Sequence, residues 1–144
     1  GVVLGKDIID VDIDSHYVKP FCNILLPDTG KIFGRNSNPR SHFIYKSSGS
    51  SKKFDIRNNT LIEIRTGDQQ TIFPPSIHTS GEKICWEKNT HYGEVEFSTL
   101  NQKVGLIAFL GFLLSQYPST PGTRDELCLC VSSILIKNDI NPPV

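Results

Sequence analysis

The stretch IIDVDIDSH, residues 8–16, alternates acidic and apolar side chains. Its acidic residues are Asp10, Asp12 and Asp14, and the residues between them are Val11 and Ile13. A period of two is that of a β-strand, so the three carboxylates share one face and the apolar side chains share the other. Asp is depleted in strands, and like charges that lie close together repel one another. The stretch therefore predicts one of two things. It is either a strand with a solvated acidic face, or a set of oxygen ligands for a divalent cation such as Mg²⁺ or Mn²⁺.

The segments around this stretch fall into two blocks. Alternating patterns predict strands over residues 41–46, 53–57, 61–67 and 82–88, with a turn at Asn58-Asn59 between the second and the third. Residues 28–40 are rich in Gly, Asn, Ser and Pro, which predicts turns, and residues 20–27 suggest a short helix. From about Glu96 the apolar spacing becomes helical, and a second helix is predicted from Thr123, whose capping box is completed by Glu126. Strands followed by two helices predict an α+β fold.

Length and charge limit the class of protein. The chain has 144 residues, enough for one compact domain, and its fifteen basic and fifteen acidic side chains cancel. The balance is uneven, because residues 31–53 hold six basic side chains and no acidic one. These six are Lys31, Arg35, Arg40, Lys46, Lys52 and Lys53. The segment could bind phosphates or could be a solvated loop. We expect Arg35, Arg40 and Lys46 to contact nucleic acid.

The cysteines and the apolar segments indicate the compartment. The four cysteines, Cys22, Cys85, Cys128 and Cys130, have no zinc-site spacing. The sequence begins in a strand-like segment without a signal peptide, so we expect reduced thiols and a cytoplasmic location. The apolar run at residues 104–114 is too short to span a bilayer and predicts a buried helix, so we expect no membrane partner.

Three further short motifs carry side chains that could take part in binding or catalysis. His42 opens a strand in the string RSH, directly after the turn-rich basic segment. Glu63 and Arg65 alternate with apolar residues in the string IEIR. Ser76 and His78 follow two prolines in PPSIHTSGEKICW, residues 74–86. Each of these residue types is suited to metal or phosphate binding, although each motif taken alone is also compatible with a structural role.

In their order and spacing, VDID, RSH, IEIR and PPSIHTSGEKICW resemble the archaeo-eukaryotic primase superfamily. The resemblance covers roughly residues 5 to 90 and is to the bifunctional primase-polymerase branch found in plasmids, phages and other mobile elements. It implies an RRM-like, antiparallel-rich catalytic sheet. The implied domain organisation is a catalytic core over residues 1–95 and a C-terminal helical extension over residues 96–144. The family's module usually has a further α/β part before its D-x-D strand, so we expect that N-terminal part to be absent from this sequence.

The resemblance assigns the metal ligands and catalytic acids to Asp12, Asp14 and Glu63. Asp10 and Asp12 also form a D-x-D pair, so Asp10 stays an alternative to Asp14. The family normally has Asp where this chain has Glu63, and a small residue where it has Arg40. His42, Arg65, Ser76 and His78 fall at positions that the resemblance places near the nucleotide phosphates.

The function implied is template-directed nucleotidyl transfer, as a DNA primase, a DNA polymerase or both, in replication of a mobile element. Its cofactors would be two Mg²⁺ or Mn²⁺ ions, which bridge the attacking and leaving oxygens. Its partners would be nucleoside triphosphates, a single-stranded DNA template and a primer. The sequence has no G-x-x-x-x-G-K-[ST] motif, so any helicase partner would lie elsewhere on the same chain or on another chain.

Two other functions fit parts of the pattern. A single-stranded nucleic-acid-binding module without catalysis would use the basic segment and the aromatic residues interleaved with it, which are Phe33, Phe43, Tyr45 and Phe54. That alternative leaves the acids unexplained, because carboxylates repel phosphates without a metal. A metal-dependent nuclease would use the same acids, with water replacing the 3′-hydroxyl as the nucleophile.

Overall fold

The computed structural model describes residues 1–118 and 122–137. These residues form seven strands and three helices, as the α+β prediction requires. The strands are β1 (Val2–Ile13), β2 (Lys31–Arg35), β3 (Asn38–Lys46), β4 (Lys52–Ile56), β5 (Asn59–Thr71), β6 (Ile84–Asn89) and β7 (Gly93–Glu94). The helices are α1 (Lys19–Leu25), α2 (Phe97–Ser115) and α3 (Thr123–Lys137).

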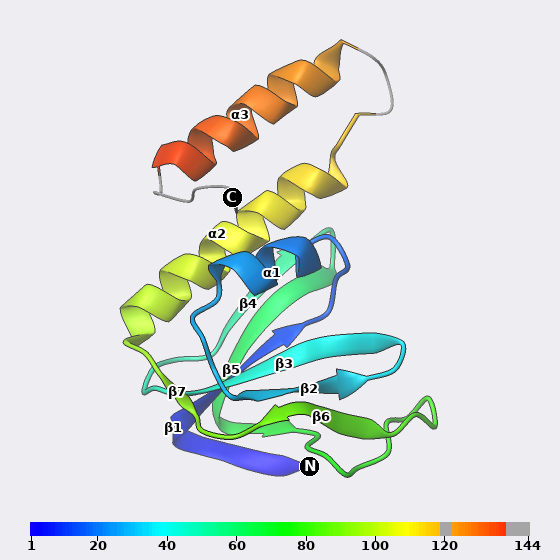
Figure 1. Cartoon of the computed structure of the whole chain (residues 1–144), viewed down its shortest axis with the longest axis vertical. Coiled ribbons are helices and arrows are strands. Elements are labelled where there is room, and N and C mark those ends of the chain that lie inside the picture. The colour runs from blue at the N-terminus through cyan, green and yellow to red at the C-terminus, as the bar shows by residue number, and fades with distance from the viewer. Residues whose placement is uncertain (119–121, 138–144) are drawn as a thin grey trace.

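The strands form a single sheet in the order β4-β5-β1-β3-β2-β6. Neighbours along this order are antiparallel, and the two-residue β7 pairs in parallel with β3. Figure 1 shows α1 and α2 on the same side of the sheet, with α3 beyond α2. The aspartate strand β1 therefore lies in the middle of the sheet, between β5 and β3. The alternative of an edge strand with a solvated acidic face is therefore wrong: Asp10 is 0% exposed and Asp12 is 5% exposed, and among the three aspartates Asp14 alone is exposed.

Strict alternation on β1, β3 and β5 gives the sheet two different faces. Val11 on β1 lies opposite Phe43 on β3 and Ile64 on β5, and all three side chains are buried in the main core with α1 and α2. The intervening polar residues share the other face. A second, smaller apolar cluster of Phe33 and Ile44 with Ile84 lies on that face beside them.

The helix α2 belongs to the core of the sheet domain. Its residues Leu100, Val104, Ile107 and Leu110 are at most 1% exposed and join the same cluster as the strands. The predicted helical extension from residue 96 thus begins with a helix that covers the sheet. Among the described residues, α2 is also long and apolar enough to span a membrane when judged by length and composition alone.

Two local predictions need correction. Residues 31–35 and 38–40, predicted as turns, form β2 and the start of β3. Ile32 and Phe33 of β2 alternate between the two apolar clusters, which accounts for the first of these strands. The β4–β5 turn is centred on Arg57-Asn58, one residue earlier than predicted. Both of these residues have left-handed φ angles, of 46° and 68°, which is typical of a two-residue hairpin turn.

Candidate metal and nucleotide site

The sheet register brings the acidic residues of two motifs together. Asp12 on β1 lies directly opposite Glu63 on β5 and, on its other side, opposite His42 on β3. Directly opposed residues point to the same face of a sheet, so these three side chains converge. Asp14 follows the end of β1, where its backbone N–H donates to the Leu61 carbonyl at 3.2 Å. This bond holds Asp14 beside the start of β5.

Asp12, Asp14 and Glu63 form a cluster with the geometry of a cation site. One carboxylate oxygen from each lies within 4.8 Å of the others, and Asp12 is buried, Glu63 half-buried and Asp14 exposed. Oxygen ligands from two adjacent strands are the donor set that Mg²⁺ and Mn²⁺ prefer, so the residues present fit such an ion. Asp10 is not part of this cluster. Among the described residues, the D-x-D pair that fits a metal is therefore Asp12-Asp14.

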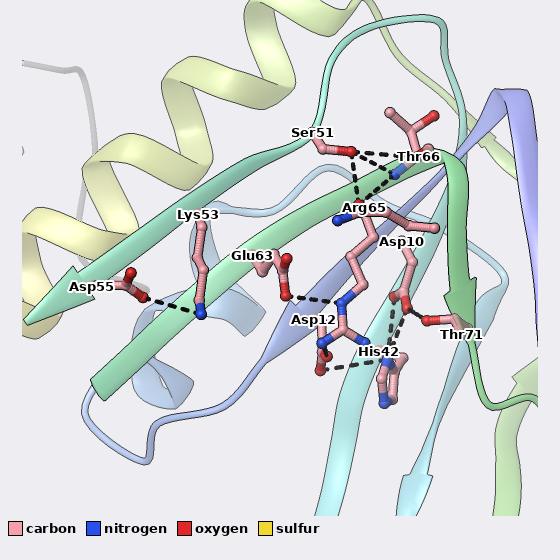
Figure 2. A network of polar contacts seen from close by, with 11 residues as sticks. Asp10, Asp12, His42, Ser51, Lys53, Asp55, Glu63, Arg65, Thr66 and Thr71 are labelled. Atoms are coloured by element: carbon pink, nitrogen blue, oxygen red, sulfur yellow. Dashed lines mark hydrogen bonds and ion pairs between the residues drawn. The ribbon is translucent and has the colours of Figure 1, made fainter. Parts of the chain in front are cut away.

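The electrostatics of the cluster also suit a cation. Burial raises the pKa of Asp12 to about 7, and Asp10 and Asp14 add to that rise while His42 and Arg65 oppose it. Burial also raises the pKa of Asp14. Arg65 bridges two of the acids, with Nη2 2.6 Å from Asp12 Oδ2 and Nε 2.9 Å from Glu63 Oε2 (Figure 2). Four carboxyl groups, of Asp10, Asp12, Asp14 and Glu63, thus gather around Arg65 and His42, and a divalent cation would stabilise their ionised forms.

His42 is held by a carboxylate that does not belong to the cluster. Its Nδ1 lies 3.0 Å from Asp10 Oδ2 and 3.5 Å from Asp12 Oδ1 (Figure 2). Burial alone would lower the pKa of His42, but the attraction and hydrogen bond of Asp10 outweigh it, so the pKa is raised. The same effect applies to Arg65. There, burial is outweighed chiefly by Asp12, which keeps the guanidinium charged.

Two hollows meet at the acids. The smaller, of about 250 Å³, is lined by Asp12 and Asp14 together with two arginines and two histidines: Arg35, Arg65, His42 and His78. The larger, of about 730 Å³, runs from Asp14, Glu63 and Arg65 along the β4–β5 hairpin. Its lining includes His16, Tyr17, Lys53 and Arg57. Asp14 and Arg65 line both hollows, so the acidic cluster stands at their junction.

Only one of the two candidate residues in the PPSIH motif, His78, lies at the site. His78 lines the smaller hollow, and its Nδ1 accepts from the Ser80 backbone N–H at 3.1 Å, which leaves Nε2 as the protonated nitrogen of the neutral ring. Ser76 does not line that hollow. Its backbone is used for structure, because its carbonyl accepts from the Ile84 N–H at 2.9 Å.

Of the three basic residues expected to contact nucleic acid, Arg35 and Arg40 line a common hollow, whereas Lys46 lies on another part of the surface. Arg35 faces the smaller hollow and is anchored by Glu82, with 3.2 Å between Nε and Oε2. Arg40 instead pairs with Glu87 and with the side-chain oxygen of Asn23. Lys46 lies four residues from His42 along β3 and pairs with Glu94 at 3.0 Å.

Several residues at the site were not predicted from the sequence. Lys53 was visible only as one of six basic residues in a stretch. Tyr17 and Arg57 carried no signal, because they lie in short connections whose position depends on the sheet. Thr71, whose hydroxyl donates to Asp10, is 61 residues away in sequence, so nothing local indicated it.

No family model, no curated protein and no solved structure matches this chain, so the functional argument rests on the geometry of the site.

Proposed function

We propose that this chain is a nucleotidyltransferase of the primase-polymerase type, which joins a nucleoside triphosphate to the 3′-end of a primer on a single-stranded DNA template. The observation that carries the proposal is the acidic cluster at the junction of two hollows. A transfer between two substrates needs both of them to reach the same metal site from different sides. A lone binding pocket would not need that arrangement.

The smaller hollow suits the triphosphate. Arg35, His42, Arg65 and His78 offer donors to phosphate oxygens, and Arg can bind phosphate through two parallel hydrogen bonds. Asp12 and Asp14 line the same hollow, so the phosphates would lie beside the metal ligands. When bound, two Mg²⁺ or Mn²⁺ ions would stabilise the charge on the attacking and leaving oxygens.

The larger hollow suits the nucleic-acid strand. Lys53 and Arg57 can neutralise backbone phosphates, and the exposed His16 ring and the half-buried Tyr17 ring offer surfaces for base stacking. The order of the motifs supports the finer assignment to an RRM-like primase-polymerase sheet and to replication of a mobile element. The antiparallel sheet, with helices on the face opposite the acids, is compatible with that assignment.

The two alternatives explain less of the geometry. A single-strand-binding module built on the basic segment would need the aromatic rings of that segment to be exposed. Phe33, Phe43 and Tyr45 are instead at most 3% exposed, and Phe54 packs against the main core. A nuclease would use the acidic cluster equally well. A nuclease does not, however, require a separate hollow in which two arginines and two histidines line the wall beside two of the acids.

The first experiment is calorimetric titration of a deoxynucleoside triphosphate into the protein with Mn²⁺. Asp12→Ala, Asp14→Ala and Glu63→Ala are compared with Asp7→Ala, which removes an exposed carboxylate from the same strand outside the site. We expect metal-dependent binding by the wild type and by Asp7→Ala, and loss of binding in the other three. Equal binding by all five proteins, or none by the wild type, would contradict the proposal.

Binding is measured before activity because it depends on fewer parts of the protein. A second assay then incubates the protein with Mn²⁺, a primed template and deoxynucleotides. Primer extension supports nucleotidyl transfer, whereas shortening of the strand would favour the nuclease.

A further inference from the structure

Asp10 is a fully buried carboxylate that the proposed chemistry does not use. Its side chain is 0% exposed and lies outside the acidic cluster. It accepts a hydrogen bond from the Thr71 hydroxyl at the end of β5, and His42 Nδ1 lies 3.0 Å from its Oδ2 and 3.3 Å from its Oδ1. A buried carboxylate is costly unless it is hydrogen-bonded, so the Asp10 position is stabilised by these two partners.

The contact with Asp10 fixes one edge of the His42 ring. A carboxylate only accepts hydrogen bonds, so Nδ1 is the nitrogen that carries the proton in this contact. One flat face of the ring is fixed as well, because Phe33 stacks on it with centroids 4.5 Å apart and planes 13° apart. Phe33 is itself held by Phe73 and Trp86. The ring therefore has a single orientation.

That orientation determines what His42 offers to the smaller hollow. Figure 2 shows the second ring nitrogen on the side away from Asp10. His42 lines the hollow with a side chain that is 15% exposed, so only a small part of the ring is available there. With Nδ1 committed to Asp10, the available nitrogen is Nε2.

We propose that Asp10 is the positioning residue for His42: it holds the ring through Nδ1–H and so directs the Nε2 edge of the ring toward a phosphate group of the nucleoside triphosphate. The identity of the ligand rests on the proposed function, whereas the orientation of the ring does not. Thr71 supports the arrangement by holding the Asp10 carboxylate in place.

The test is a double-mutant cycle on nucleotide affinity in the presence of Mn²⁺. Asp10→Asn keeps the size of the side chain but removes the charged acceptor, and we expect it to weaken nucleotide binding about 10- to 100-fold. His42→Ala should weaken binding to a similar extent, and the double variant should be no weaker than His42→Ala alone. An equal loss from Asp10→Asn in the His42→Ala background would overturn the inference, because Asp10 would then act independently of the ring.

Measuring Mn²⁺ affinity without nucleotide distinguishes a positioning role of Asp10 from a role as a metal ligand. We expect Asp10→Asn to bind Mn²⁺ as the wild type does, and Asp12→Ala to lose it. Loss of Mn²⁺ binding in Asp10→Asn would make Asp10 a metal ligand and overturn the inference.

A spectroscopic measurement tests the ring orientation without any nucleotide. Nitrogen-15 NMR of the histidine side chains should show a His42 Nδ1–H protected from solvent exchange in the wild type and in Asp12→Asn. The signal should be lost in Asp10→Asn. If Asp10→Asn does not fold, Thr71→Val and Thr71→Ser replace it, because only the serine keeps the hydroxyl. We then expect the valine variant to weaken both the signal and nucleotide binding, and unchanged values would overturn the inference.

The two proposals fail in different ways. If the wild type binds no nucleotide but shows the protected Nδ1–H, the proposed function fails and the positioning of His42 stands. If the wild type binds nucleotide but shows no such proton, the function stands and the role of Asp10 fails.

Discussion

Arg65 on β5 forms an ion pair with Asp12 on β1, with 2.6 Å between Nη2 and Oδ2. The same guanidinium reaches Glu63, so one cation stabilises two of the three acids in the absence of metal. A metal ion that binds these acids would take over part of this role. Arg65 would then be available to phosphate oxygens in the smaller hollow, which it also lines.

Removing the Arg65 charge should therefore destabilise the metal-free protein. We expect Arg65→Ala to lower the free energy of unfolding by about 1 to 3 kcal/mol in EDTA, because it leaves buried carboxylates without their partner. Mn²⁺ should restore part of the loss. Urea unfolding with and without Mn²⁺ measures both effects. Arg40→Ala, which breaks an ion pair outside the site, is the control and should cost less than about 1 kcal/mol with no response to Mn²⁺.

Asp12 should make the stability of the metal-free protein depend on pH. Its pKa in the folded state is raised, from 3.8 to about 7, so the folded protein holds this proton more tightly than the unfolded chain. The stabilising contribution of the protonated group is complete below about pH 4 and is lost as the pH rises through 7. At pH 8 in EDTA, Asp12→Asn should therefore be more stable than the wild type, on the order of a few kcal/mol.

Urea unfolding at pH 5 and pH 8 checks the sign of this effect. The advantage of Asp12→Asn should be larger at pH 8 than at pH 5, and Mn²⁺ should reduce it by stabilising the wild type alone. A wild type that is more stable than the variant at pH 8 in EDTA would contradict the expectation.

Lys53 and Lys46 form a matched pair that tests whether the larger hollow binds nucleic acid. Both are exposed lysines on strands, but only Lys53 lines the larger hollow, and Lys46 lies on β3 beside Glu94. We expect Lys53→Gln to weaken binding of single-stranded DNA and to lower the salt dependence of the affinity by about one counterion. Lys46→Gln should change neither value. Fluorescence anisotropy at several salt concentrations measures both, and equal effects would place the strand elsewhere.

Gly111 and Gly105 on α2 should respond in opposite directions to the same change. A Cβ atom on Gly111 would clash with Cγ1 of Val18, the residue before α1, whereas one on Gly105 would meet nothing closer than Phe54 at 3.9 Å. Gly111→Ala should destabilise the protein by about 1 to 3 kcal/mol through overpacking. Gly105→Ala should stabilise it by about 0.5 to 1 kcal/mol through helix propensity. Thermal unfolding of the two variants shows whether α2 packs against α1 as described.

Local patterns were enough to predict much of the fold. The hairpin of β4 and β5 follows from two alternating runs joined by an asparagine turn, and α2 and α3 follow from helical spacing. β2 was missed because its two core residues, Ile32 and Phe33, are surrounded by Gly, Asn and Pro. In that case burial on both faces of the sheet outweighed the turn propensity of the flanking residues.

The candidate site was predictable as far as its residue types and order allowed. The sequence could not decide between Asp10 and Asp14, because both fit the same alternation. The choice depends on Thr71 and His42, which meet Asp10 only in the folded sheet. Likewise, the sequence shows that Arg40 and Lys46 are positively charged, but not that they form ion pairs with Glu87 and Glu94 respectively.

Because β1 lies in the middle of the sheet, the acidic cluster is complete only after a later strand has been synthesised and has paired with β1. Its aspartates are translated before Glu63 and Arg65, which are carried by a strand that begins at residue 59. In a nascent chain the acidic cluster is therefore incomplete until β5 has docked beside β1. Measuring Mn²⁺ affinity on chains truncated at increasing lengths would thus show at which length β5 pairs with β1.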